Sequence, residues 1–228
     1  MTKIKDSIAV IGEGITEYYY FNSLKDEFTQ LNLRPMYPKH STSLEDLEQE
    51  IEKAKSRGYN LIFCVIDMDN KKDGAEKQNY LNLKKRLEGT WSIKKTDQIY
   101  TIRFIENERC TELFFLFYFT YTSRHFQDQP AVLQELNKRC KYEKTEKFFK
   151  AHSLHQYFQK HGGSYMEALR NAAHSMKEKE ETGRDHTYSQ MAELFAALGI
   201  IENDKATSAQ SGVASSNKTI KQNNKWTN

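Results

Sequence analysis

One stretch of the chain decides the fold: Asn60-Leu-Ile-Phe-Cys-Val-Ile66, with Asp67-Met-Asp69 directly behind it. A continuous apolar run of this length is typical of a β-strand that is buried on both faces, as the strands of parallel sheets are. A second apolar run, Ser7-Ile-Ala-Val-Ile11, stops at Gly12. Both runs therefore predict buried strands of one sheet.

Segments with helical periodicity lie between the strands. We expect helices from Thr16 through Leu31, behind the capping-box pattern Thr42-Ser-Leu-Glu45, and over roughly Ala75–Leu87. The segment Arg34–Lys39 contains two prolines and suits an edge strand or a connection, whereas Gln98–Ile105 alternates like a strand. This order predicts an α/β fold with a mostly parallel sheet flanked by helices.

Beyond Thr111 the sequence predicts helices only, over residues 111–124, 130–138, 144–160, 164–181 and 187–201. The last residues, 203–228, are rich in Ser, Asn, Lys and Thr and poor in large apolar groups, so we expect a disordered tail there. The predicted organisation is an α/β core over 1–124, a helical extension packed on it over 125–202, and the tail over 203–228.

Composition narrows the class of protein. The 228 residues carry 34 Lys and Arg against 31 Asp and Glu, and the net charge of +3 decides nothing about nucleic-acid binding. The longest apolar run, around Leu113–Phe119, is much shorter than the ~20 residues of a membrane-spanning helix. Three widely spaced cysteines form no C-x-x-C pair, which argues against a disulfide framework or structural zinc and favours a reducing cytoplasm. We expect no signal peptide.

Acidic residues follow the predicted strands at the ends where parallel sheets bind ligands. Gly12-Glu-Gly-Ile-Thr-Glu17 follows the first strand, and Asp67 and Asp69 follow the central one. Adjacent parallel strands lie ~4.8 Å apart, so four carboxylates would gather there and repel each other by several kcal/mol. A hard cation such as Mg²⁺ or Mn²⁺ relieves this repulsion, and the sequence therefore predicts a metal site. The glycines beside Glu13 are expected to supply strained backbone angles at a sharp turn.

Each acidic motif also has a plainer explanation. Thr16 can be a helix N-cap and Glu17 a first-turn partner of the helix dipole. An Asp-x-Asp after a strand is a common turn. The conjunction of the glycine-flanked acidic turn with Asp67 and Asp69 after the central strand favours a metal site over these alternatives.

The two motifs together resemble the Toprim fold of topoisomerases, primases and OLD-family nucleases. More narrowly, the chain is similar over most of residues 7–200 to the RloB-like family of prokaryotic defence-associated proteins, which are often paired with an ATPase. That family also shows a Cys-Phe-Glu-Leu-Trp-type helix start, which here reads Cys110-Thr-Glu-Leu-Phe114, and a Tyr-Lys-type segment, here Lys141-Tyr-Glu-Lys144. The chain departs from the family pattern at Arg109, where proline is usual, and at Thr111, which replaces an aromatic residue.

The resemblance implies a Toprim-like sheet followed by a helical C-terminal extension, and metal-dependent hydrolysis of a phosphodiester in DNA or RNA, tRNA included. It implies Glu13, Asp67 and Asp69 as catalytic residues, with Mg²⁺ or Mn²⁺ as cofactor. The implied metal ligands are Glu13, Glu17, Asp67, Asp69 and Glu112. One ion would be held by Asp67 and Asp69 with Glu13 or Glu17 and a second by Glu17 and Glu112, while Glu13 is also a candidate general acid–base.

The basic residues near these acids, Lys71, Lys72 and Arg109, are candidates for contact with nucleic-acid phosphates. The resemblance adds Lys141 and Lys144 as further candidates. A solvated loop and helix face is the plainer explanation for the basic residues beyond the Asp-x-Asp motif.

Two other functions compete with a nuclease. A non-catalytic nucleic-acid-binding or regulatory subunit of an ATPase defence complex would keep the fold but has no physical need for clustered carboxylates. A receiver-type signalling module also carries acids after two of its strands, yet it requires a lysine from a later strand and lacks a helical extension. No G-x-x-x-x-G-K-[ST] phosphate loop occurs, so nucleotide hydrolysis would need the ATPase partner.

Overall fold

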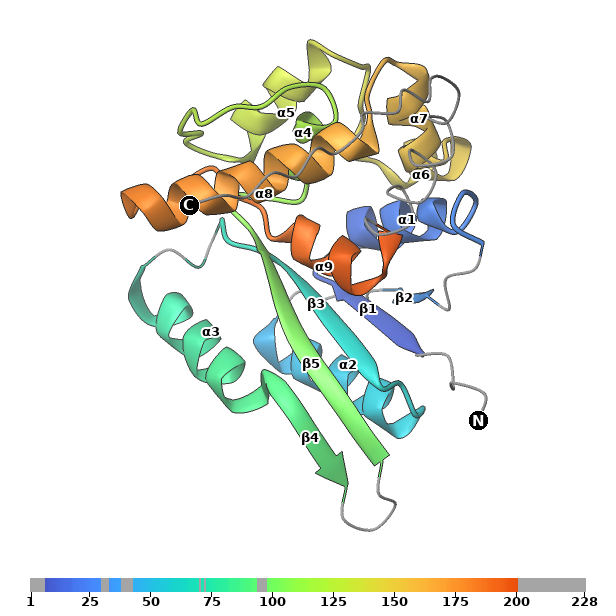
Figure 1. Ribbon diagram of the computed structural model, residues 1–228, viewed down its shortest axis with the longest axis vertical. Helices are drawn as coiled ribbons and strands as arrows, with labels where there is room; N and C mark the ends of the chain where they lie inside the picture. Colours follow the sequence, from blue (N-terminus) through green and yellow to red (C-terminus); the bar gives the residue numbers. More distant parts are fainter. Residues whose placement is uncertain are drawn as a thin grey trace, which may run out of the picture.

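The chain folds around a five-stranded sheet of order β2-β1-β3-β5-β4 (Figure 1). A computed structural model describes residues 7–29, 33–37, 43–69, 71, 73–93 and 98–200. The central strands β1 (Ile8–Gly12), β3 (Leu61–Asp67) and β5 (Gln98–Asn107) are parallel. At the edges lie β2 (Leu33–Met36), which is parallel, and β4 (Gly89–Ile93), which is antiparallel. The predicted α/β fold with a mostly parallel sheet is confirmed.

Helices cover both faces of the sheet, because successive residues of each strand point to opposite faces. On one face α2 (Leu44–Ser56) and α3 (Gly74–Leu87) pack on a core that includes Ala9 of β1. On the other face α1 (Ile15–Leu24) and the C-terminal helices pack on a core that includes Val10 (Figure 1). The continuous apolar strands of the sequence are thus explained by burial on both sides.

The described residues that follow β5, up to residue 200, form helices and the loops between them. Its helices are α4 (Glu112–Phe117), α5 (Gln129–Asn137), α6 (Glu146–Ala151), α7 (Leu154–Lys160), α8 (Tyr165–Thr182) and α9 (Met191–Ala197). The core on this side contains Phe63 from the sheet together with Phe115, Phe158 and Leu169 from the helices. One hydrophobic core therefore crosses residue 124, where we expect the α/β core to give way to the extension.

Several predicted helices differ from the observed ones. The first ends at Leu24 rather than near Leu31, which itself lies outside the described residues. The predicted helix 111–124 shortens to α4, and 187–201 shortens to α9. The predicted helix 144–160 is broken at His152, whose backbone is extended, and continues as α7 behind Ser153. Apolar residues packed in the core keep their periodicity after the backbone has left the helix, which explains the overestimates.

The helix cap of α2 is displaced by one residue from the predicted capping box. Ser43 is the N-cap, and its Oγ accepts a hydrogen bond from the Asp46 amide at 3.1 Å. Thr42 and the predicted tail over 203–228 lie outside the described residues. Gly58 follows the helix with a φ of +81°, a left-handed conformation that suits glycine.

The antiparallel strand β4 is an element that the sequence prediction lacks. It forms a hairpin with β5, in which Trp91 lies opposite Tyr100. Because β4 is antiparallel and the strand order is β2-β1-β3-β5-β4, the sheet differs from that of receiver-type folds, which is all parallel with the order 2-1-3-4-5. The structure therefore gives the receiver hypothesis no support.

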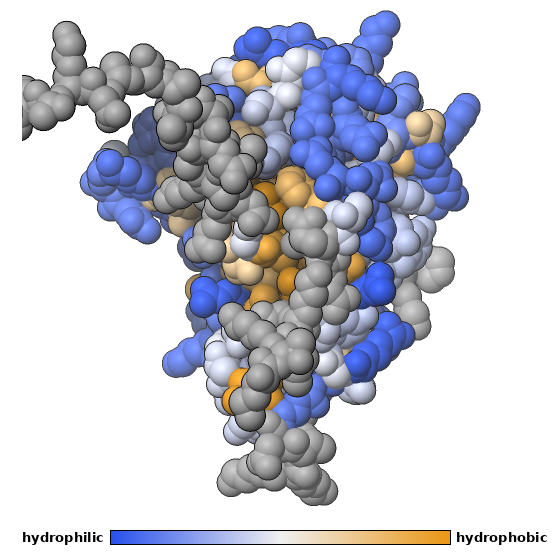
Figure 2. Space-filling model, turned by 45° about the vertical axis from the view of Figure 1, so that its right-hand side comes forward, coloured by the Kyte–Doolittle hydropathy of each residue, from blue (hydrophilic) through white to orange (hydrophobic). Residues whose placement is uncertain are grey.

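Few large apolar side chains are exposed in the described part of the chain; they are Tyr37, Leu81, Trp91 and Ile99. On the face shown in Figure 2, hydrophilic residues predominate near the top, and hydrophobic residues gather in a central band. Among the described helices, none combines the length and the apolar character that crossing a lipid bilayer requires.

Candidate functional site

A cleft of about 320 Å³ lies at the carboxyl end of the sheet. It is lined by Glu13, Gly14, Ile15, Thr16, Glu17, Asp67, Asp69, Gln129 and Lys144. Gly12 of β1 is level with Val65 of the neighbouring β3, so the turns that follow the two strands meet. Four acidic residues predicted to gather here, Glu13, Glu17, Asp67 and Asp69, do line one cleft.

Glu13 forms an ion pair with Lys71, whose Nζ lies 2.7 Å from the Glu13 Oε1. The same ammonium group donates a hydrogen bond to the Asp67 carbonyl at 3.0 Å. Burial raises the pKa of Glu13 above its ordinary value, and Lys71 offsets only part of that effect. Lys71 is therefore an inward-facing partner of the acids, with a side chain that is 11% exposed, rather than a residue on the rim.

Glu17 combines a structural bond with a buried charge. Its Oε2 accepts a hydrogen bond from the amide of the N-cap residue Gly14 at 2.9 Å, which is the one bond of a capping box that a glycine N-cap allows at the start of α1. The pKa of Glu17 is raised to about 7, mainly by burial and also by the charge of Glu112, while hydrogen bonding to Thr111 and the charge of Lys144 oppose the rise. The plainer explanation of Glu17 as a helix-start residue is thus correct, whereas the N-cap is Gly14 and not Thr16.

The glycines beside Glu13 serve a purpose other than the predicted one. Neither Gly12 nor Gly14 has a positive φ, so the turn needs no strained backbone there. A Cβ at Gly12 would instead lie 2.3 Å from the Glu17 Cβ. Glycine is required at this position because Glu17 packs directly against the backbone.

Asp67, at the end of β3, is held by the turn between β5 and α4. Its Oδ1 accepts hydrogen bonds from the Thr111 amide at 2.8 Å and from the Thr111 hydroxyl at 3.1 Å. Burial raises the pKa of Asp67 well above its ordinary value, and the charges of Glu17, Glu112 and Glu13 add to the rise. The charges of these three acids thus disfavour ionisation of Asp67.

Asp69 is paired with Arg109 of the same turn, at 3.4 Å between the Arg109 Nη1 and the Asp69 Oδ1. Arg109 also donates from Nε to the Phe126 carbonyl at 2.7 Å, and its Nη2 lies 3.2 Å from His125 Nε2. Its backbone φ is +70°, which is uncommon for a residue other than glycine. The side chain is only 11% exposed, so Arg109 mainly contacts protein groups.

Glu112 lies fully buried behind the cleft. Its Oε1 accepts hydrogen bonds from Lys144 Nζ and Tyr142 Oη, each at 3.0 Å, and Gln129 lies 3.4 Å from Oε2. Burial alone would lower the pKa of Lys144, but Glu112, Asp67 and Glu17 outweigh it and raise that pKa. The extension thus supplies a stable positive charge to the acidic site.

The donor set has the chemistry that a hard divalent cation requires. It consists of carboxylate oxygens, and burial raises the pKa values of three of the acids, Glu13, Glu17 and Asp67. Within the described residues, no three Asp, Glu, His or Cys side chains converge closely enough to coordinate one ion. The carboxylates engage Lys71, Lys144, Arg109 and Thr111 instead, so an ion held here would take the place of some of these contacts.

Lys72 and Lys141 are the remaining predicted basic residues. Lys72 is outside the described residues, and Lys141 is exposed, with its carbonyl accepting a bond from Tyr157. Three residues of the site, Thr111, Gln129 and Tyr142, were not predicted. Their only signals were proximity to Glu112 or Lys144 along the chain and, for Gln129, a position at the start of a helix.

Comparisons with known proteins identify the family. Among curated proteins and solved structures, no match to the chain was found. The model of the family described as RloB-like protein matches residues 8–198. This span contains β1 through α9 and every residue that lines the acidic cleft. The chain therefore belongs to the RloB-like protein family.

Proposed function

We propose that the chain is a metal-dependent phosphodiester hydrolase of the Toprim type, which cuts DNA or RNA, tRNA included, in a prokaryotic anti-phage defence system. One observation carries the proposal: five carboxylates and three basic side chains meet in and behind one cleft at the carboxyl end of a parallel sheet. Ligands of such sheets bind at this end. The Toprim relation, the defence role and an ATPase partner rest on the resemblance of the acidic motifs.

The proposed ligands of Mg²⁺ or Mn²⁺ are Glu13, Glu17, Asp67, Asp69 and Glu112. A divalent cation, when bound, would polarise the scissile phosphate and lower the pKa of an attacking water. Glu13 is the candidate general acid–base, because its raised pKa lets it exchange a proton closer to neutral pH than an ordinary glutamate does. Lys144 would supply positive charge beside the phosphate, since its ammonium reaches the cleft from the extension.

A nuclease assay on DNA and tRNA with Mg²⁺ or Mn²⁺ tests this function. Glu13→Gln and Asp67→Asn keep the shape of each side chain and remove its charge, and we expect each to lower the cleavage rate by about 10²–10⁴-fold. Glu76→Gln, at an exposed position on α3, is the matched control and should cut like the wild type. Undiminished cleavage by both site variants would contradict the proposed site.

A second candidate is a non-catalytic nucleic-acid-binding or regulatory subunit of an ATPase complex. The observation that favours it is the pairing of Glu13, Asp69 and Glu112 with basic side chains, which balances much of the acidic charge without a metal. This candidate predicts nucleic-acid binding that Asp67→Asn leaves intact and no cleavage by the wild type, with or without the partner.

The proposed compartment is the cytoplasm. Cys64, Cys110 and Cys140 are all buried and free, and thiols remain reduced most readily in a reducing compartment.

A further inference from the structure

We propose that the turn between β5 and α4 positions the two aspartates of the Asp-x-Asp motif: Thr111 acts through Asp67 and Arg109 acts through Asp69. Neither residue touches the reacting groups in this proposal, so both are positioning residues. The inference rests on the proposed metal-dependent function and adds to it the residues that orient its acids.

Thr111 fixes the Asp67 carboxylate from two donors. The amide and the hydroxyl of Thr111 both donate to Oδ1, at 2.8 and 3.1 Å, and the Thr111 side chain also contacts the Glu17 carboxylate. Thr111 is completely buried, and its hydroxyl also lies within hydrogen-bonding range of Asn107. A carboxylate held this way keeps one orientation, as acids at metal sites commonly do through hydrogen bonds from neighbouring residues.

Arg109 fixes Asp69 through both backbone and side chain. The Asp69 amide donates to the Arg109 carbonyl at 3.1 Å, and the Met68 amide donates to the Asn107 carbonyl at 3.0 Å. The ladder between β3 and β5 thus continues into the Asp-x-Asp motif. The guanidinium then reaches the Asp69 carboxylate while its Nε holds the Phe126 carbonyl.

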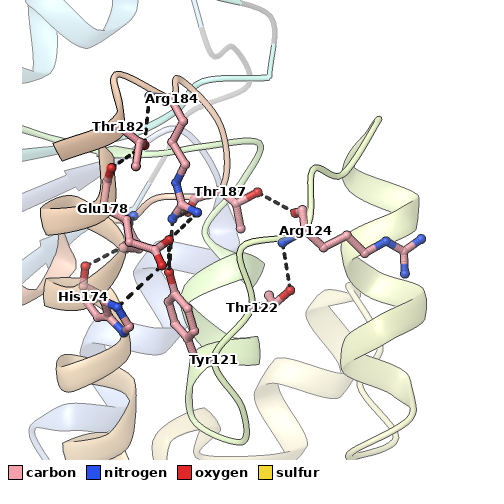
Figure 3. Close-up of polar contacts among 11 residues, drawn as sticks. Tyr121, Thr122, Arg124, His174, Glu178, Thr182, Arg184 and Thr187 are labelled. Atoms are coloured by element: carbon pink, nitrogen blue, oxygen red, sulfur yellow. Dashed lines mark hydrogen bonds and ion pairs between the residues drawn. The ribbon is translucent and has the colours of Figure 1, made fainter. Parts of the chain in front are cut away.

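The segment around Phe126, whose carbonyl accepts a hydrogen bond from Arg109, is itself held by hydrogen bonds to other parts of the extension. Around Phe126, the chain from Tyr121 to Arg124 is bonded to the end of α8 and the loop behind it (Figure 3). Tyr121 donates to Glu178 at 2.6 Å, and the Thr187 hydroxyl donates to the Arg124 carbonyl at 2.6 Å. Arg184 pairs with Glu178 and donates to the Thr187 carbonyl. Arg109 therefore links the Asp69 carboxylate to the Phe126 carbonyl, in a segment that is bonded to the rest of the extension.

The backbone of Arg109 lies in the left-handed region, which is costly for a residue other than glycine. A φ of +70° is unfavourable for arginine and impossible for proline, whose ring holds φ near −65°.

The test measures Mn²⁺ affinity by calorimetry, which does not depend on cleavage. Thr111→Val keeps the shape and the amide but removes the hydroxyl, and we expect Mn²⁺ to bind roughly 10-fold more weakly or worse. Thr111→Ser restores the hydroxyl and should bind nearly as the wild type does. Thr111→Ala, which also lacks the hydroxyl and needs less space, should repeat the result of the valine variant.

Arg109→Lys keeps the charge but loses the planar group that contacts three partners, and we expect a similar loss of Mn²⁺ affinity. At saturating Mn²⁺ the KM for nucleic acid should stay unchanged while kcat falls, because a positioning residue does not bind the substrate. Matched controls are Thr90→Val, whose hydroxyl contacts Thr101 on the hairpin, and Arg86→Lys, which removes a comparable arginine–carboxylate pair with Glu48. Circular dichroism of every variant verifies the fold.

The outcomes separate the two proposals. Wild-type affinity in Thr111→Val, or no rescue by Thr111→Ser, would overturn the positioning role while the proposed function stands. A raised KM with unchanged Mn²⁺ affinity in Arg109→Lys would overturn the role of Arg109 and make it a phosphate contact. No Mn²⁺ binding by the wild type would overturn both the proposed function and the positioning role.

Discussion

Glu17 meets two demands that oppose each other. Its carboxylate caps the first helix, and helix starts favour negative charge, yet the side chain is buried among other acids. Burial prevails and raises the pKa of Glu17 from 4.5 to about 7. The folded protein therefore binds a proton at Glu17 more readily than the unfolded chain does.

The first prediction follows from the direction of that shift. Because the pKa is raised on folding, the native state holds more protons between pH 4.5 and 7, and Glu17 lowers the free energy of unfolding as pH rises through this window. Glu17→Gln removes the titration and keeps an acceptor for the Gly14 amide. Without divalent cations, the variant should gain stability over the wild type by on the order of 2 kcal/mol between pH 5 and pH 8.

Urea denaturation at both pH values measures this difference. Glu76→Gln, an exposed glutamate in the first turn of α3, is the control for loss of one negative charge at a helix start. A constant stability difference between Glu17→Gln and the wild type at the two pH values would contradict the raised pKa.

Among single residues, the acids were predictable and their partners were not. Glu13, Glu17, Asp67 and Asp69 follow strands that the apolar pattern identifies, and all four line the cleft. Thr111 is more than 40 residues from Asp67 along the chain, and its two hydrogen bonds depend on the contact of β5 with β3. No local pattern encodes such a partner.

At the scale of elements, a buried polar chain ties three helices together. The Tyr118 hydroxyl lies 2.7 Å from both the Tyr20 hydroxyl of α1 and the His155 Nδ1 of α7, and His155 Nε2 lies 2.9 Å from Glu27. Burial lowers the pKa of His155, although Glu27 opposes this, so the neutral ring accepts from one phenol and donates to the carboxylate. Each side chain of this series, from Tyr20 through Tyr118 and His155 to Glu27, thus has a hydrogen-bond partner.

The second prediction removes the central member of that chain. Tyr118→Phe leaves the Tyr20 hydroxyl and His155 Nδ1 without their shared partner, which should lower the free energy of unfolding by about 1–3 kcal/mol. Chemical denaturation of Tyr118→Phe and of Tyr59→Phe, a partly buried tyrosine on the other face of the sheet, compares the two. An equal effect of both substitutions would indicate that the loss is not due to the polar chain.

Element types were predicted better than element ends. The apolar runs identify β1, β3 and β5, because strands buried on both faces leave a strong signal. The edge strand β4 has only five residues and pairs on one side with β5, so its pattern is weak. The break between α6 and α7 falls at His152 and Ser153, whose backbones are extended, and no glycine or proline marks it in the sequence.

On the scale of the whole molecule, the sheet and the extension share one core. Phe63 and Val65 of β3 belong to the same buried cluster as Phe158 of α7 and Leu169 of α8. The extension also supplies Lys144 and Tyr142 to the buried Glu112. Neither the fold nor the site is complete without it.

The third prediction concerns this shared core. A chain that ends at residue 124 should lack a cooperative unfolding transition, because one face of its sheet would be stripped of the helices that bury it. A chain that ends at residue 200, which keeps every described element, is the matched control and should unfold in one transition. Thermal unfolding followed by near-ultraviolet circular dichroism distinguishes the two, and cooperative unfolding of the shorter chain would show an independent domain.

The sequence by itself determined the class of fold, the central strands and the four acids that follow them, because apolar runs and the residues behind them are local features. Only the tertiary structure decided how those acids are held. Lys71 turns inward to Glu13, Thr111 and Arg109 reach the two aspartates, and Lys144 arrives from the extension. These contacts join segments that are far apart in the chain, and their geometry arises only when both faces of the sheet are covered.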